Sequence, residues 1–189
     1  MKKKSLRSLT MLCLIAGSTV IFSCKNEEKK EDVPVPMQNE MHQPEEEQVV
    51  EAYEGEELQA EFREEIIAKI YNSYVEIKNA FVNSDAATAS REAANLAEIA
   101  TDKEKIAVIA KAIAAADDVN KQREEFSKLT AAMEPILDNA LESGAIYKQY
   151  CPMAFEGKGD YWYSNSKDIF NPYFGDKMLK CGRIETTIQ

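Results

Sequence analysis

The sequence predicts a mainly α-helical domain: an up-down bundle of three to four helices with an irregular, aromatic-rich C-terminal cap that has room for one short β-hairpin. Three observations support this fold class. Apolar residues recur at spacings of three and four over much of residues 58–144, which is the period of one helix face. Short polar segments with Ser-Asp or Asp-Asp pairs separate these stretches. From about residue 145 onward the helical period disappears, and aromatic residues, Gly and Pro become frequent.

Composition and charge exclude several classes of function. The chain has 189 residues and a formal net charge of −10, and no nucleic-acid partner is expected because phosphate contacts require a basic surface. Its one histidine, His42, nearly rules out a Ser-His-Asp site or a multi-histidine zinc site in the core. The sequence contains no nucleophile elbow, phosphate-binding loop or nucleotide fingerprint. We therefore expect a protein that is not an enzyme.

Residues 1–23 have the pattern of a secretory signal. A basic start is followed by an apolar run from Leu9 to Phe22, which is too short to span a bilayer comfortably. The run ends in IFSC at residues 21–24, which resembles the lipobox of bacterial lipoproteins. The resemblance implies that Cys24 becomes a lipidated N-terminus and anchors the protein in the outer membrane, on the periplasmic face or at the cell surface. The alternatives are a plain signal peptide and an uncleaved anchor.

Residues 24–57 are expected to form an acidic, flexible tether. The part from residue 25 to residue 57 contains 3 Lys against 12 Asp or Glu, together with several prolines. Such a segment has too little apolar surface to order itself. The tether would then hold the folded domain, residues 58–189, away from the membrane.

The first helix is expected from about residue 56 to residue 83. Its predicted buried face is a stripe of apolar residues at spacings of three and four. A Ser84-Asp85 pair then supplies an N-cap for the next helix. The stripe consists of Phe62, Ile66, Ile70, Tyr74, Ile77 and Phe81.

The middle of the domain is expected to contain the remaining helices of the bundle. An alanine-rich segment, residues 80–116, predicts closely packed helices with a cap at Thr-Asp, residues 101–102. The Asp-Asp pair at residues 117–118 begins a further long helix, which we expect to contain Pro135 and to end near Gly144. Short connections between these helices favour antiparallel neighbours, as in an up-down bundle.

The C-terminal cap, residues 145–189, is expected to be irregular. Two segments, 145–151 and 183–188, have the character of short strands, and the aromatic residues at 161–163 are expected in the core of the cap. We expect Arg123, on the last long helix, either to pair with a carboxylate or to tie the cap to the bundle. The candidate carboxylates are those of Glu124, Asp160 and Asp168.

The candidate metal ligands are sulfur atoms of the cap. Cys151 and Cys181 each have a methionine nearby in the sequence, Met153 and Met178 respectively. Thiolate and thioether groups are soft ligands that select Cu(I) over harder ions. These four side chains would suffice for one Cu(I) site.

Neighbouring residues bear on this candidate site, and an alternative competes with it. The sequence NPYFG at residues 171–175 predicts a rigid turn that would bring the second Cys–Met pair back to the first. Lys177 and Lys180 would lower the pKa of the thiols if they lay nearby. However, two cysteines in an exported protein usually form a disulfide. Spacing alone favours a bond between Cys151 and Cys181, which would staple the cap.

Several motifs of the chain together resemble a bacterial domain of unknown function, over about residues 66–189. They are YCPMA at residues 150–154, Trp162, Ile169 with NPYFG at 171–175, KML at 177–179, CG at 181–182, and Gln122-Arg123 with Phe126. This domain occurs alone in small exported lipoproteins and is also appended to the periplasmic adaptor subunits of copper- and silver-type heavy-metal efflux pumps. The resemblance implies a role near heavy-metal handling, with copper as the metal and an efflux adaptor as the candidate partner. In the alternative, a disulfide-stapled module docks on such an adaptor or on another envelope protein.

Overall fold

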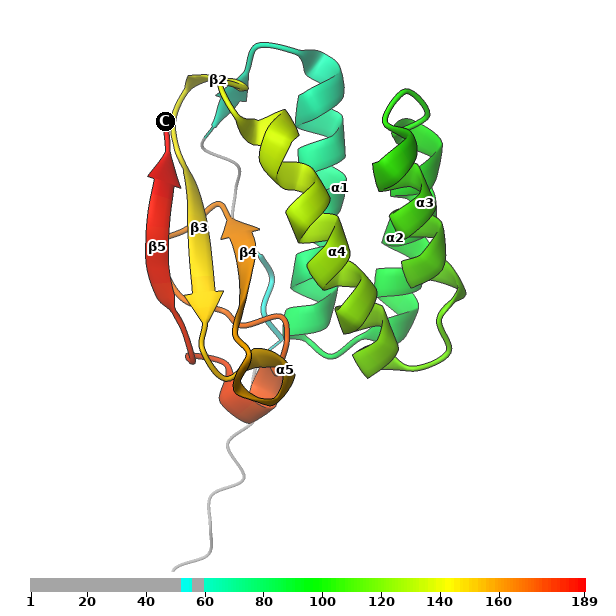
Figure 1. Ribbon diagram of the computed structural model, residues 1–189, viewed down its shortest axis with the longest axis vertical. Helices are drawn as coiled ribbons and strands as arrows, with labels where there is room; N and C mark the ends of the chain where they lie inside the picture. The colour runs from blue at the N-terminus through cyan, green and yellow to red at the C-terminus, as the bar shows by residue number, and fades with distance from the viewer. Residues whose placement is uncertain (1–51, 56–59) are drawn as a thin grey trace, which may run out of the picture. The chain divides into compact units, whose positions relative to one another are not determined.

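The computed structural model describes residues 52–55 and 60–189 (Figure 1). Within these residues the fold is mainly helical, with four long helices, a few short antiparallel strands and an aromatic cluster in the C-terminal region, which confirms the predicted fold class. The signal peptide, Cys24 and most of the predicted tether lie outside the described residues. None of the helices in the described part of the chain combines the length and the apolar character that crossing a membrane requires.

The first long helix, α1 (Glu65–Val82), begins later than the sequence predicted. Residue Phe62 lies instead in a short strand, β1 (Glu61–Phe62), where it pairs with Leu141 of β2 (Leu141–Ser143). This extended segment precludes a helical start near residue 56. The rest of the predicted stripe was correct except for one exposed isoleucine at its N-terminal end. The four buried members are Ile70, Tyr74, Ile77 and Phe81, and the exposed one is Ile66.

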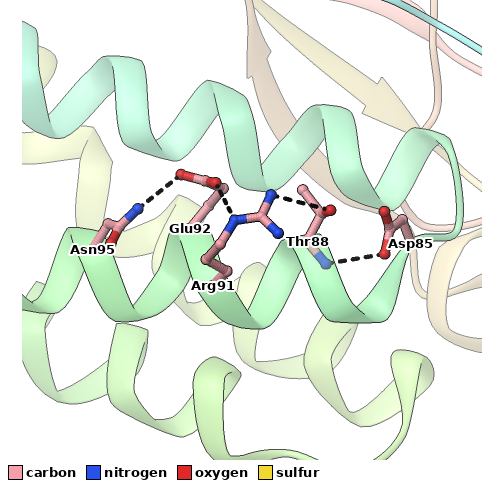
Figure 2. A network of polar contacts seen from close by, with 5 residues as sticks. All are labelled: Asp85, Thr88, Arg91, Glu92 and Asn95. Atoms are coloured by element: carbon pink, nitrogen blue, oxygen red, sulfur yellow. Dashed lines mark hydrogen bonds and ion pairs between the residues drawn. The ribbon is translucent and has the colours of Figure 1, made fainter.

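Helix α2 (Ala86–Ile99) begins directly after the predicted N-cap residue, Asp85. The carboxylate of Asp85 accepts a hydrogen bond of 2.9 Å from the backbone N–H of Thr88. Figure 2 shows how polar side chains continue from this cap along α2: Arg91 donates to the Thr88 hydroxyl and to Glu92, which in turn accepts from Asn95. These groups are exposed, so the network lies on the solvent side of α2.

Helix α3 (Glu104–Ala115) packs against α2, and its alanines allow the close approach that the sequence predicted. The prediction that residues 101–102 supply the N-cap of this helix is wrong. Lys103 occupies the N-cap position and makes no side-chain cap hydrogen bond.

Helix α4 (Val119–Leu137) starts at the predicted Asp118 cap, whose carboxylate accepts from the backbone N–H groups of the following turn. It ends at Leu137 and not near Gly144. Pro135 lies in its last turn, where its missing N–H weakens the helix. The chain then turns at Asn139, which has a positive φ of 57°, and enters β2.

The cap contains a three-stranded antiparallel sheet of order β4-β3-β5. Strands β3 (Ile146–Cys151) and β5 (Arg183–Ile188) lie at the two segments predicted as strands, whereas β4 (Asp160–Ser164) was expected only as part of the core. The connections contain a short turn, α5 (Ala154–Gly157), and a 3-10 helix, η1 (Gly175–Met178). Figure 1 shows β4 next to α1 and α4 and β5 at the far edge of the sheet, away from the helices.

Buried tyrosines join the sheet to the helices. The hydroxyl of Tyr74 on α1 accepts a 3.0 Å hydrogen bond from the backbone N–H of Tyr163 on β4. It also forms a 2.9 Å hydrogen bond with the hydroxyl of Thr130 on α4. Burial raises the pKa of Tyr74, so this hydroxyl stays neutral. One side chain therefore links all three elements at the centre of the core.

Candidate functional site

The structure brings the two cysteines of the cap into direct contact. Cys151 is the last residue of β3, and Cys181 lies two residues before β5. Because these strands are antiparallel neighbours, with Tyr150 paired to Arg183, the end of one lies beside the start of the other. The two Sγ atoms are 3.3 Å apart, and both cysteines are free thiols. Two residues that are 30 positions apart in the chain thus form one pair.

The two thiols differ in their exposure to solvent. The side chain of Cys151 is fully buried, at 0% exposure, within the hydrophobic core. Cys181 is half-buried and lies at the edge of the core. A reagent or an ion must therefore approach the pair from the side of Cys181.

Asn171 fixes the chain that carries Cys181. Its side-chain amide donates a 2.7 Å hydrogen bond to the carbonyl of Cys181, and its Oδ1 accepts a 2.8 Å bond from the backbone N–H of Tyr173. Its own N–H donates to the carbonyl of Leu179. Asn171 is fully buried, so these bonds are shielded from competing water. The segment 171–175 therefore folds as a turn that holds Cys181 against β3.

Gly182 allows the chain after Cys181 to pass very close to Trp162. A Cβ atom at position 182 would lie 2.8 Å from the Trp162 ring and 3.1 Å from the carbonyl oxygen of Tyr150. Any other residue would push the segment away from the sheet. Close packing next to the cysteine pair thus explains why glycine follows Cys181 in the CG motif at residues 181–182.

The two candidate methionine ligands lie in different surroundings. Met153 is 54% exposed and follows Cys151 by two residues. It precedes a turn in which Phe155, Glu156 and Gly157 all have positive φ, a left-handed conformation that disfavours non-glycine residues. Met178 is half-buried at the end of η1, and its carbonyl accepts a 3.0 Å hydrogen bond from the N–H of Cys181. Both methionines are near the pair in the sequence. The direct sulfur–sulfur contact in the structure is the one between Cys151 and Cys181.

The expected lowering of the thiol pKa by the lysines is not found at Cys181. The pKa of Cys181 is raised, first because burial disfavours the thiolate and then because of its hydrogen bond to Cys151 and the charge there. The ammonium of Lys180 lies 3.5 Å from the centre of the Phe170 ring, a cation–π contact. Burial thus favours the neutral thiol of Cys181 over its thiolate. Within the described residues there is also no group of three or more His, Cys, Asp or Glu side chains that could hold a metal ion.

Arg123 ties the cap to the bundle through carbonyl oxygens. Its Nε donates a 2.8 Å bond to Pro172 of the cap, and its Nη2 donates a 2.9 Å bond to Phe81 at the end of α1 and a 3.1 Å bond to the hydroxyl of Ser84. Arg123 is buried, and burial lowers its pKa, an effect opposed by the negative charge of Asp176. The expected pairing with a carboxylate is thus replaced by hydrogen bonds to the backbone.

The prediction that the aromatic residues at 161–163 lie in the core was correct for Trp162 and Tyr163, whereas Tyr161 is only half-buried. Trp162 and Tyr163 are buried, and Tyr173 packs edge-on against Trp162 with ring centroids 6.1 Å apart. What the sequence did not reveal is that these residues form β4, directly paired with β3. The segment DYWYS at 160–164 has three aromatic residues in succession, so it lacks the alternation of polar and apolar residues that indicates a strand.

A comparison with protein-family models identifies a domain in the chain. Residues 70–143 match the family model described as "Protein of unknown function (DUF3347)", which confirms that the chain contains an uncharacterised domain. The matched segment runs from α1 to β2, so both cysteines of the pair lie after it. No curated protein and no solved structure matches the chain.

Proposed function

We propose that this protein is a non-catalytic envelope lipoprotein that takes part in heavy-metal handling and binds Cu(I) through Cys151 and Cys181. Met153 and Met178 would act as weaker ligands. The observation that carries the proposal is the 3.3 Å contact between two thiols that come from separate segments of the cap. Thiolates are the preferred protein ligands of Cu(I), because both ligand and metal are soft.

The geometry of the pair fits a bridging ion after a small movement. Two metal–sulfur bonds of about 2.3 Å at a tetrahedral angle separate the sulfurs by roughly 3.8 Å. The sulfurs would therefore need to move apart by about half an ångström from their 3.3 Å separation. Binding would also release thiol protons, since the thiolate is the ligand, and this makes uptake stronger at higher pH.

The remaining parts of the proposal rest on the sequence. The lipobox supports anchoring in the outer membrane through Cys24, and the acidic segment up to residue 57 supports a spacer between the membrane and the domain. The resemblance to domains appended to heavy-metal efflux adaptors supports such an adaptor as the partner. The protein would then hold copper in the envelope for that partner.

A second function is favoured by the same short distance. A disulfide requires sulfurs at about 2.05 Å, which needs closure of the pair by a little over an ångström. Exported proteins are in an oxidising compartment, and burial disfavours the charged thiolate of Cys181. In this case the bond would staple the cap, with a stabilisation of about 3–4 kcal/mol, and the protein would act as a docking module.

Anaerobic titration with a competing Cu(I) chelator tests the metal site. Reduced wild-type protein should bind one Cu(I) per chain, and Cys181→Ser should abolish this binding because a thiolate is lost. Met153→Leu and Met178→Leu should weaken binding without unfolding the protein, because volume is nearly conserved. Met133→Leu, in the core of α4 outside the cap, is the matched control and should have no effect. If reduced wild type takes up no more Cu(I) than Cys181→Ser, the metal site does not exist.

A further inference from the structure

Residues 52–55, which precede the helical bundle, lie against the C-terminal part of α1; we call them the N-terminal strap. The side chain of Asn83, at the end of α1, clamps the backbone of Tyr53 with two hydrogen bonds of 2.9 Å: it accepts from the N–H and donates to the carbonyl. Gly55 has a positive φ of 88°, and a Cβ there would lie only 2.6 Å from the amide of Asn79. The strap is therefore fitted closely to α1 over its described length.

The side chain of Tyr53 reaches from α1 to the loop that carries Cys181. This loop, residues 165–182, joins β4 to β5 and contains Phe170. The rings of Tyr53 and Phe170 are in contact, with centroids 4.2 Å apart and planes 31° apart. On α1, the Nζ of Lys78 lies 5.0 Å from the centre of the Tyr53 ring and 3.5 Å from its hydroxyl. Tyr53 therefore lies between a cation of α1 and an aromatic ring of the loop.

Phe170 connects the strap to the cysteine pair. Phe170 precedes Asn171 in the chain, and the side chain of Asn171 donates a hydrogen bond to the carbonyl of Cys181. The ammonium of Lys180 makes a cation–π contact with the Phe170 ring. Tyr53 is thus linked to Cys181 in two steps. Its ring contacts Phe170, and the side chain of the next residue, Asn171, is hydrogen-bonded to the carbonyl of Cys181. The loop is otherwise held at its start by Gln149, which donates to the carbonyls of residues 166 and 168, and in its middle by Arg123.

We propose that the N-terminal strap is a clamp that controls access to the cysteine pair. Cys151 is fully buried, so a metal ion or a thiol reagent reaches it only when the loop 165–182 moves away from β3. Such local opening has its own free energy, which is set by the contacts that hold the segment. Release of Tyr53 removes its ring contact with Phe170, the neighbour of Asn171 in the chain, and the pair becomes accessible more often. The strap lies at the N-terminal side of the domain, so whatever displaces residues 52–55 opens the site.

The rate of thiol labelling tests the clamp. The reduced full-length chain is treated with a maleimide, and the labelling of Cys151 and Cys181 is followed separately by peptide mass spectrometry. Tyr53→Ala should raise both rates about tenfold, because an aromatic contact and its cation–π partner are lost. Asn83→Ala should also raise them, because it frees the backbone of the strap. Tyr53→Phe keeps the ring and should label at nearly the wild-type rate.

Tyr161→Ala is the matched control. This half-buried tyrosine of β4 also has a lysine over its ring, Lys148 at 4.9 Å, and both residues lie outside the strap and the loop 165–182. Labelling rates of Tyr53→Ala within twofold of wild type, or equal to those of Tyr161→Ala, overturn the proposal. If Tyr53→Ala unfolds the domain, Asn83→Ala decides by the same comparison, since it keeps every aromatic ring. Labelling needs no metal, so the clamp and the copper site can fail independently.

Discussion

At the scale of single residues, the cap depends on groups whose roles are set by close approach and by buried hydrogen bonds. Asn171 places the carbonyl of Cys181, Gly182 allows the chain to pass Trp162, and Arg123 joins the cap to α1. The sequence showed that these residue types are present in a tight turn region. It could not show their partners, because contacts such as those of Arg123 with Pro172 and Phe81 join segments that are distant in the chain.

Gly182→Ala should destabilise the domain by about 1–3 kcal/mol, the usual cost of forcing an extra methyl group into a packed site. The added Cβ would meet the ring of Trp162 at 2.8 Å. Gly157→Ala is the control, because position 157 has a positive φ but no atom within 4 Å of a Cβ. Urea unfolding of the two variants separates the clash from backbone strain. Equal losses of stability in both would contradict a steric role for Gly182.

Arg123→Lys should cost about 2–3 kcal/mol, although the charge is kept. A lysine cannot reproduce the planar set of donors that reaches Pro172, Phe81 and Ser84, and buried carbonyls would lose their partner. Arg91→Lys, in the exposed network of Figure 2, should change stability by less than about 0.5 kcal/mol. Thermal unfolding measures both variants. A loss for Arg123→Lys as small as that for Arg91→Lys would mean that the cap is held by other contacts.

At the scale of elements, helices that have both a periodic stripe and an acidic N-cap were predicted well. Asp85 and Asp118 cap α2 and α4 as expected. Boundaries were wrong where a strand replaced a helical turn, at β1 and at β2, because a ladder of two or three residue pairs leaves no periodic signal. β4 was missed for the same reason: its pairing with β3 is decided by tertiary packing.

Asp85, the N-cap residue of α2, should make the free energy of unfolding depend on pH. The pKa of Asp85 is held below its ordinary value of 3.8, chiefly because the carboxylate accepts a hydrogen bond from the N–H of Thr88. A carboxyl with a lowered folded-state pKa stabilises the fold above its unfolded pKa, and this contribution is lost as the pH falls through the folded value. Asp85→Ala should therefore lower stability by about 1 kcal/mol at pH 7.

The comparison of pH 7 with pH 2 isolates this effect. The difference in unfolding free energy between wild type and Asp85→Ala should shrink toward pH 2, because the wild-type carboxyl takes up its proton as the pH falls through the folded pKa. Asp85→Asn caps the helix without a charge and should remove most of the pH dependence while keeping the helix. A difference between wild type and Asp85→Ala that is the same at both pH values would contradict an ionic cap.

At the scale of the whole molecule, the fold class and the location of the candidate site could be predicted, but the contacts of the site could not. The helical period of residues 65–137 and the strand-like segments at 145–151 and 183–188 are local signals. The contact of Cys151 with Cys181 follows from the antiparallel pairing of β3 with β5, which is a long-range event. The strap is a similar case: residues 52–55 have the composition of a tether, and it is the side chain of Asn83 that fixes them.

The central claim is that the cysteine pair works as reduced thiols and not as a staple. The most direct measurement is the state of the pair in protein taken from its own cell envelope. Thiols are blocked by alkylation at the moment of lysis, without oxygen, and the peptides that carry Cys151 and Cys181 are analysed by mass spectrometry. The account predicts that both cysteines are found alkylated as free thiols in most molecules. Recovery of the two peptides joined by a disulfide would contradict it.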